Sequence, residues 1–251
     1  MSPRFTFSIA SLLMLSLAGC DWMPGKPERP QVDRGNSAAD LDFTSLWSTR
    51  CAGCHGTDGD WGGARPMNDA VYQSIVTDDY LRTVTSNGID QTLMPAFVDT
   101  QGGELTSEQI DIIVKGIRST WGSGPKVTGA PPLTGSLGTV AKGAVVFTAY
   151  CSGCHGDTGS GGSAGSVIDP SYLALVSDQS LRSAVICGRT DLGMPDWRGL
   201  HGQQAAEARN GLPDLTDTQV SDVVAWLASH RIEYPGQPYP VLEQPGTGRS
   251  E

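Results

Sequence analysis

The chain has 251 residues, enough for one large domain or two small ones. Its formal charge is −10 and it has no basic cluster, so nucleic acid is not an expected partner. The acidic balance instead favours a protein partner with a basic patch.

The first segment, residues 1–19, has the pattern of a signal peptide. Arg4 precedes an apolar run that is too short to span a membrane. The run ends in "LAGC" at 17–20, which resembles a bacterial lipobox and implies that Cys20 is lipidated. The alternative is a plain secretory peptide with an incidental cysteine. We expect a lipid anchor on the periplasmic side of the cell membrane, and Asp21 favours the inner membrane by the same resemblance.

Three polar stretches that contain proline and glycine divide the rest of the chain into two blocks. The expected divisions are a flexible tether at 20–40, a first domain at 41–121, a linker at 122–137, a second domain at 138–232 and a tail at 233–251.

The two blocks are copies of one another. At a constant offset of 100 residues, Leu81, Arg82 and Gly88 meet identical residues in the second copy. After the second Met-Pro pair the second copy carries extra residues within 198–214, and the match resumes at an offset of 110. The chain therefore contains one structural unit twice.

Each copy predicts helices and no strand. A helix is expected to lead into each copy near 42–50 and 142–150, with shorter helices near 69–86 and 169–186. Each copy then closes with an amphipathic helix, for which Thr106 and Thr216 are suitable N-caps. The apolar positions of the closing helices are Ile110, Ile113, Val114 and Ile117, and then Val220, Val223, Val224 and Leu227. The predicted fold class is all-α.

The stretches "CAGCHG" at 51–56 and "CSGCHG" at 151–156 carry the chemistry. Two thiols spaced by two residues can each add to one vinyl group of a porphyrin, and the adjacent histidine can then bind the iron. The motif predicts two covalently bound haem c groups. The expected attachment residues are Cys51, Cys54, Cys151 and Cys154, and the expected axial ligands are His55 and His155.

Two methionines are the predicted sixth ligands of the irons. Met94 lies 39 residues after its histidine and Met194 also lies 39 residues after its own. Each precedes a proline and follows a poorly helical loop. The alternative is a pair of core methionines, but the shared position in both copies favours ligation.

With these motifs, each block resembles a class I cytochrome c, and the pair resembles a dihaem cytochrome c. The resemblance covers 41–121 and 138–231 and implies two tandem class I cytochrome c domains, each wrapped around its haem. It also implies outer-sphere electron transfer between redox proteins or with a membrane respiratory complex, with no catalytic residue and no small-molecule substrate. The alternative function is a haem oxidoreductase of the thiosulfate dehydrogenase or peroxidase type, with one accessible haem.

The family often packs a glycine of its first helix against an aromatic residue of its last. Gly143 and Trp226 fit this pattern in the second copy, whereas Phe43 and Gly116 exchange the large and small sides in the first. The family also uses a proline carbonyl to orient the haem histidine. Pro66 suits that role, and the second copy has serine at the equivalent position, so another carbonyl is expected there.

Three further residues leave alternatives open. Cys187 is a buried inert thiol, an intermolecular disulfide partner or a thiolate that reaches the iron. Arg82 and Arg182 stand at equivalent positions and either meet haem propionates or lie on a solvated helix face.

Overall fold

The computed structural model describes residues 41–90, 92–124, 126–199 and 211–232. These residues all belong to one compact unit, which begins at Ala38. The predicted signal peptide, Cys20 with its tether, the tail at 233–251 and residues 200–210 of the insertion lie outside the described residues.

Four of the helices described in the first repeat begin where a short polar side chain caps them. Helix α1 (Phe43–Leu46) continues through a π-helical turn, Trp47–Cys51, into α2 (Ala52–His55). Helices α3 (Ala70–Ile75), α4 (Asp78–Asn87) and α5 (Ser107–Trp121) follow. As predicted, Thr106 caps α5, and it forms a capping box with Gln109.

The second repeat has the same order of helices. It contains α6 (Val140–Tyr150), α7 (Ser152–His155), α8 (Pro170–Leu175), α9 (Asp178–Cys187) and α11 (Asp217–Ala228). The predicted N-cap Thr216 also forms a capping box, with Gln219.

The all-α fold is confirmed. Within the described ranges the only β-type pairings are isolated bridges, Val98 with Leu105 and Arg189 with Met194. None of the helices described is both long and apolar enough to cross a membrane.

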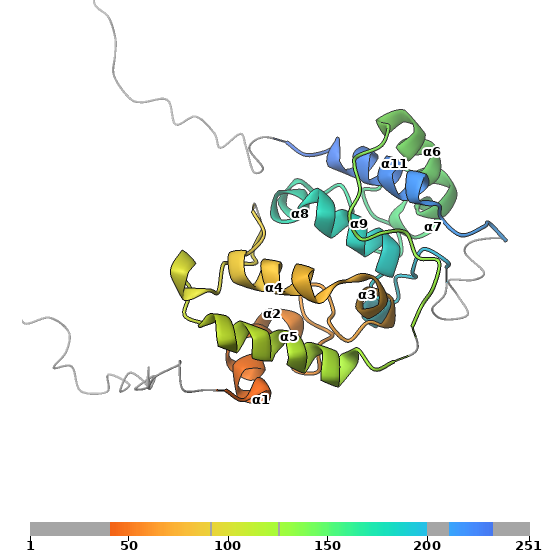
Figure 1. Ribbon diagram of the computed structural model, residues 1–251. Helices are drawn as coiled ribbons and strands as arrows, with labels where there is room; N and C mark the ends of the chain where they lie inside the picture. The colour runs from red at the N-terminus through yellow and green to blue at the C-terminus, as the bar shows by residue number, and fades with distance from the viewer. Residues whose placement is uncertain (1–40, 91, 125, 200–210, 233–251) are drawn as a thin grey trace, which may run out of the picture. The chain divides into compact units, whose positions relative to one another are not determined.

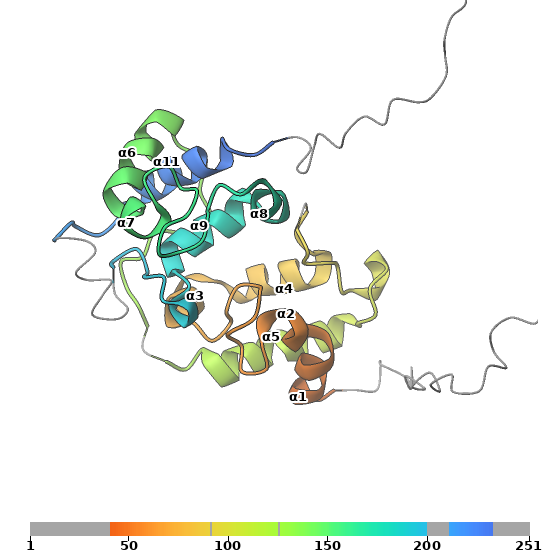
Figure 2. The ribbon, with the colours of Figure 1, turned by 180° about the vertical axis from the view of Figure 1, so that it is seen from behind.

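In each repeat the closing helix packs against the opening helix, as α11 does against α6 and α5 against α1 (Figures 1 and 2). The exchange of large and small residues at this crossing is confirmed. A Cβ atom on Gly116 would lie 2.0 Å from the Phe43 ring, so that ring occupies the space that a side chain would need. A Cβ atom on Gly143 would lie 2.7 Å from the Cβ of Trp226 and 2.0 Å from the carbonyl oxygen of Asp222.

The stretch predicted as a linker between the domains packs against the second repeat. Leu133 belongs to the hydrophobic core. The Pro132 carbonyl accepts hydrogen bonds from Arg182, and the Leu133 carbonyl accepts one from Gln179 at 2.6 Å. The segment around Pro132 and Leu133, which we call the strap, is therefore packed against the second repeat and is not a free linker.

Candidate functional site

The two Cys-x-x-Cys-His segments have the same local structure. In each, the first cysteine is half-buried, the second is exposed, and the histidine ends a short helix. The chain then turns sharply through Gly56 and Gly156, whose φ angles are +82° and +76°. A Cβ atom on Gly56 would lie 1.7 Å from the Asp60 carbonyl oxygen, so glycine is needed there.

Each histidine is oriented by a carbonyl ten residues further along the chain. The Nδ1 of His55 is 2.8 Å from the Arg65 carbonyl oxygen, and the Nδ1 of His155 is 2.8 Å from the Gly165 carbonyl oxygen. A carbonyl can only accept, so Nδ1 donates and the other ring nitrogen, Nε2, is free to bind iron. Burial also lowers the pKa of His55, which favours the neutral ring that a metal needs.

The expectation that Pro66 supplies this carbonyl is wrong. The acceptor is one residue earlier, at Arg65, and Gly165 takes the equivalent position in the second repeat. A proline restricts the residue before it to extended conformations, so Pro66 shapes the peptide that presents the acceptor. Both repeats therefore use the same backbone position, and the serine at 166 changes nothing at the histidine.

The loops that follow the histidines are held by the same backbone hydrogen bonds at an offset of 100 residues. The amide of the tenth residue after the second cysteine donates to that cysteine's carbonyl, at 2.9 Å in both repeats. The bonds are Ala64 to Cys54 and Ala164 to Cys154, then Met67 to Gly59 and Val167 to Gly159. The histidine side of each site thus shares these backbone hydrogen bonds in the two repeats.

The methionine loops also match. Gly88 and Gly188 end the preceding helices with φ angles of +72° and +70°. The next residue in each loop donates its amide to the methionine carbonyl, at 3.0 Å for Met94 and 3.1 Å for Met194. Both methionines are half-buried. The carbonyls of the two predicted distal residues therefore accept the same backbone hydrogen bond from the residue that follows the glycine.

These residues fit a covalently attached haem. The five cysteines in the described ranges are all outside disulfides, and four of them are the cysteines of the two motifs. A further observation comes from Arg65, whose Nη1 is buried and has no hydrogen-bond partner among the described residues. The carboxylate of a haem propionate is an acceptor suited to such a nitrogen.

The chain matches two protein families that agree with haem attachment at these residues. Residues 140–231 match the family Cytochrome c, and residues 38–115 match the family "Cytochrome C oxidase, cbb3-type, subunit III". The protein is a dihaem c-type cytochrome. It carries two covalently bound haem c groups, for which Cys51 with Cys54 and Cys151 with Cys154 are the matching pairs, and it is a haem electron-transfer protein.

Among solved structures, the dihaem cytochrome is similar to a chain of the reducing HAO-like protein complex Kustc0457/Kustc0458 of Kuenenia stuttgartiensis. The sequence identity is 18%, the TM-score is 0.43, and the alignment covers 76% of this chain and 96% of the other. No curated protein sequence shows significant similarity to the dihaem cytochrome.

Aromatic side chains of the closing helix cover the histidine loop in both repeats of the dihaem cytochrome. Trp226 stacks on Phe147 with ring centroids 4.1 Å apart. In the first repeat Trp121, which our sequence reasoning missed, lies 4.7 Å from Trp47, and Gly59 packs against the same indole ring. Trp121 sits four residues after the last predicted core position of its helix, and that spacing on one face was the available signal.

Two arginines that our sequence reasoning also missed tie the closing segment to the middle helices. Arg118 donates to the carbonyl of Val76 and pairs with Asp78. Arg231 donates to the carbonyl of Val176, at 2.7 Å, and pairs with Asp178. The offset between these arginines is neither 100 nor 110, so the repeat alignment did not pair them.

Arg82 and Arg182 have protein partners despite their equivalent positions. Arg82 pairs with Asp111 at the surface. The side chain of Arg182 is 3% exposed and binds the strap carbonyl, Ser221 and Asp217. The prediction of a solvated helix face is therefore confirmed for Arg82 and wrong for Arg182, whose guanidinium is buried and donates to the Pro132 carbonyl.

Cys187 is fully buried in α9, which packs against α3 of the first repeat. Burial raises the pKa of its thiol to about 12, while the charge of Arg65 opposes this shift. A buried neutral thiol fits the inert alternative and disfavours an intermolecular disulfide.

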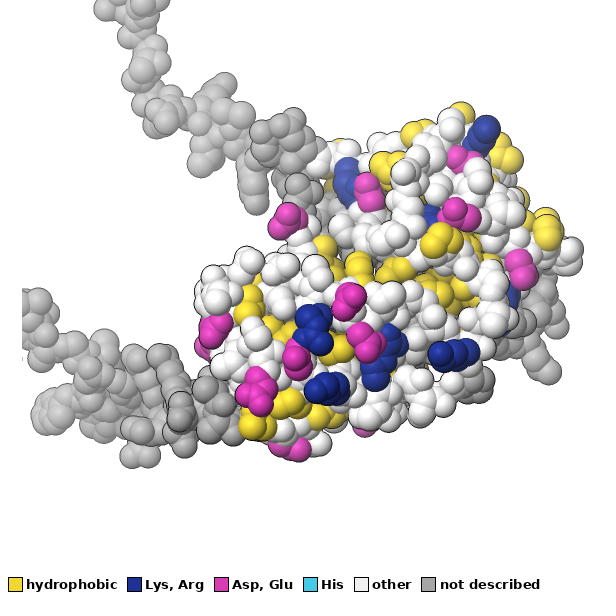
Figure 3. Space-filling view, in the orientation of Figure 1, with side chains coloured by type: hydrophobic (Ala, Val, Ile, Leu, Met, Phe, Trp, Pro, Cys, Tyr) yellow, Lys and Arg dark blue, Asp and Glu magenta, His cyan; other side chains and the backbone are white. Residues whose placement is uncertain are grey.

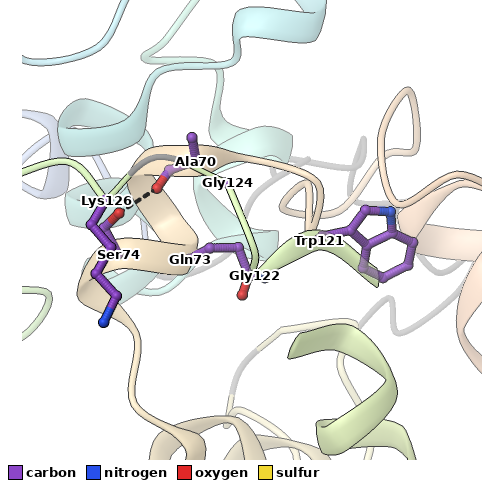
Figure 4. Close-up of a pocket in the computed structure, with 7 residues that line it drawn as sticks. All are labelled: Ala70, Gln73, Ser74, Trp121, Gly122, Gly124 and Lys126. Atoms are coloured by element: carbon purple, nitrogen blue, oxygen red, sulfur yellow. Dashed lines mark hydrogen bonds between the residues drawn. The ribbon is translucent and has the colours of Figure 1, made fainter. Parts of the chain in front are cut away.

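A small hollow lies beside the end of α5 (Figure 4). Ser74 and Lys126 lie at one end of it and the Trp121 indole at the other. The residues that line it include Ser74 and Lys126 but no histidine, cysteine or carboxylate.

Proposed function

We propose that this dihaem cytochrome is a lipid-anchored electron carrier in which histidine and methionine hold both irons. It would pass electrons one at a time between redox protein partners, or to a membrane respiratory complex. The observation that carries the proposal is the duplicated distal turn, in which Met94 and Met194 occupy the same hydrogen-bonded position after a left-handed glycine.

Filled coordination positions favour a carrier over an enzyme. When bound, each haem c supplies a one-electron couple, and His/Met ligation raises its potential relative to two histidines. The donor is oxidised by one electron and the acceptor is reduced by one, and no protein bond forms or breaks. The protein's part is to fix the histidine ring through a backbone carbonyl and to keep the methionine turn closed.

The nature of the partners is supported by charge and by one family match. The chain is acidic, and on the face in Figure 3 lysine and arginine side chains stand among aspartates and glutamates. A partner with a basic patch would be steered toward such a protein. The match of residues 38–115 to an oxidase subunit family supports a respiratory partner.

The membrane location is supported by the sequence at the start of the chain. A lipid on Cys20 would hold the cytochrome at the periplasmic side of the inner membrane, with residues 20–40 as the tether. The test is Cys20→Ser, which we expect to release the protein from washed membranes with an unchanged haem spectrum. A substituted protein that stays on the membrane would point to a protein partner as the anchor.

Ligand substitution and carbon monoxide binding test the carrier proposal. We expect the ferric protein to show a His–Met charge-transfer band for two haems and the ferrous protein to bind carbon monoxide poorly. Met94→His should lower one potential and leave the other nearly unchanged, and Met194→His should do the reverse. Stoichiometric carbon monoxide binding at the second haem would contradict the proposal and favour the oxidoreductase alternative.

A further inference from the structure

Arg65 connects the histidine of the first site to the methionine loop of the second. Its backbone carbonyl accepts the hydrogen bond from His55 at 2.8 Å. Its side chain extends the other way, and Nη2 donates to the Gly188 carbonyl at 2.8 Å. Gly188 is the left-handed residue at which the second methionine loop begins. One residue therefore touches the supports of two different haem sites.

Arg189 makes the reciprocal connection. Its backbone pairs with Met194 in both directions, at 3.1 Å and 3.0 Å, and so closes the methionine turn. Its side chain donates from Nη2 to the Gly62 carbonyl at 2.8 Å, in the histidine loop of the first repeat. Each arginine thus holds an iron-ligand loop with its backbone and the other repeat's loop with its side chain.

Asp191 completes this contact. It accepts two hydrogen bonds from the Arg189 guanidinium, at 2.9 Å and 2.8 Å, and one from the Trp61 amide at 3.2 Å. Its side chain is 4% exposed. Trp61 has a φ angle of +61°, a conformation that non-glycine residues seldom adopt and that needs support from its surroundings.

The contact is present at only one of the two places where the repeat could provide it. The residue equivalent to Arg65 is Gly165, and the residue equivalent to Arg189 is Ile89. Neither has a side chain that could donate these hydrogen bonds. The histidine loop of the first repeat and the methionine loop of the second are therefore linked, whereas the opposite pair has no such side chains.

We propose that Arg65 and Arg189 are positioning residues that couple the two haem sites. With Trp61, Gly62, Gly188 and Asp191 they form an inter-repeat clasp, through which the loop that orients His55 holds the turn that presents Met194. The inference rests on the proposed function, because it takes His55 and Met194 as iron ligands. Opening the Met194 turn requires breaking hydrogen bonds that run to the first repeat.

Amide hydrogen exchange in the holoprotein tests the clasp without relying on methionine ligation. Arg65→Ala leaves the backbone carbonyl that orients His55 and removes the bond to Gly188, together with the guanidinium nitrogen that suits a haem propionate. We expect exchange in peptides covering 188–195 to be about tenfold faster, because a charged hydrogen bond is lost. Peptides covering 88–95 should be unchanged. Arg65→Lys, which keeps one charged donor, should restore most of the protection.

The matched control is Arg118→Ala, which removes an arginine that binds carbonyls of its own repeat. It should raise exchange near α3 and leave 188–195 unchanged. If Arg65→Ala changes only first-repeat peptides, or if Arg118→Ala affects 188–195 equally, the clasp proposal is overturned.

Proton NMR of the ferrous protein then distinguishes a failure of the clasp from a failure of the proposed function. The two ligand methyl resonances are assigned from Met94→His and Met194→His. Arg65→Ala should shift the Met194 resonance more than the Met94 resonance, although the substitution lies in the first repeat. Absence of a Met194 ligand resonance in the unsubstituted protein would contradict the ligation, whereas a resonance that Arg65→Ala does not shift would contradict the coupling.

Discussion

The histidine loops of the two repeats share several backbone hydrogen bonds, but the helices behind them are packed differently. His55 and His155 donate to carbonyls at the same distance of 2.8 Å. Behind them, Phe43 fills the space over Gly116, whereas Gly143 lies under Trp226. The hydrogen bond that orients each histidine ring is thus reproduced in both repeats. Where the opening and closing helices cross, only the summed volume of the two facing side chains is kept, because either helix can supply the large residue.

The largest expected effect comes from removing the attachment cysteines of one repeat, which should unfold that repeat and leave the other folded. Cys51→Ala combined with Cys54→Ala should leave one haem per chain and unfold much of the first repeat, because the haem is a large part of so small a core. A pyridine haemochrome assay and circular dichroism would measure this. The matched variant is Cys151→Ala with Cys154→Ala. Loss of both haems from either double variant would show that the repeats do not fold separately.

The equivalent arginines should differ in their contributions to the free energy of unfolding. Arg182→Ala removes a buried guanidinium that holds the strap, and we expect a loss of about 2–3 kcal/mol. Arg82→Ala removes a surface ion pair, and we expect a loss below about 1 kcal/mol. Denaturant unfolding of both variants checks this. Equal losses would mean that the strap contributes no stability through Arg182.

The exchanged glycines should respond differently to alanine. Gly116→Ala should cost about 1–3 kcal/mol by crowding the Phe43 ring. Its cost should be smaller in a Phe43→Ala background, which relieves the crowding. Gly143→Ala crowds the Asp222 carbonyl, which is backbone, so no single side-chain change should relieve it. Additive losses for Phe43→Ala and Gly116→Ala would contradict the contact.

The smallest effect is expected at Cys187 and its equivalent, Asn87. The buried thiol, with its pKa near 12, should stay protonated and unreactive toward a maleimide between about pH 7 and pH 9. Asn87 is exposed, so Asn87→Cys in a Cys187→Ala background should react readily. Peptide mass spectrometry reports both. Rapid labelling of native Cys187 would show that α9 separates from α3 in solution.

Most of the haem-binding framework was predictable because it is local. The attachment cysteines and histidines are contiguous, and the two methionines share one spacing. The closing helices followed from a 3.6-residue period and from Thr106 and Thr216 as caps. Even the exchange at Phe43 and Gly116 was visible, because aligned copies reveal a swap of large and small residues.

The error at Pro66 has a simple cause. A proline identifies a rigid loop, but sequence does not show which of two neighbouring carbonyls faces a histidine ring. That depends on the path of the backbone through 56–67, where the sharp turn at Gly56 and the bond from Ala64 to Cys54 set the direction of each peptide. The acceptor at Arg65 became clear only from the folded loop.

The sequence by itself determined the repeat, the all-α fold class, the covalent haem motifs and the candidate ligands, because periodicity, caps and short motifs act over a few residues. The tertiary structure decided what the charged side chains do. Arg65 donates to Gly188, 123 residues away in the sequence, and Arg189 donates to Gly62, 127 residues away. Arg182 donates to the Pro132 carbonyl of the strap, 50 residues away. Such contacts depend on how the two repeats pack, and no local pattern encodes which loops will meet.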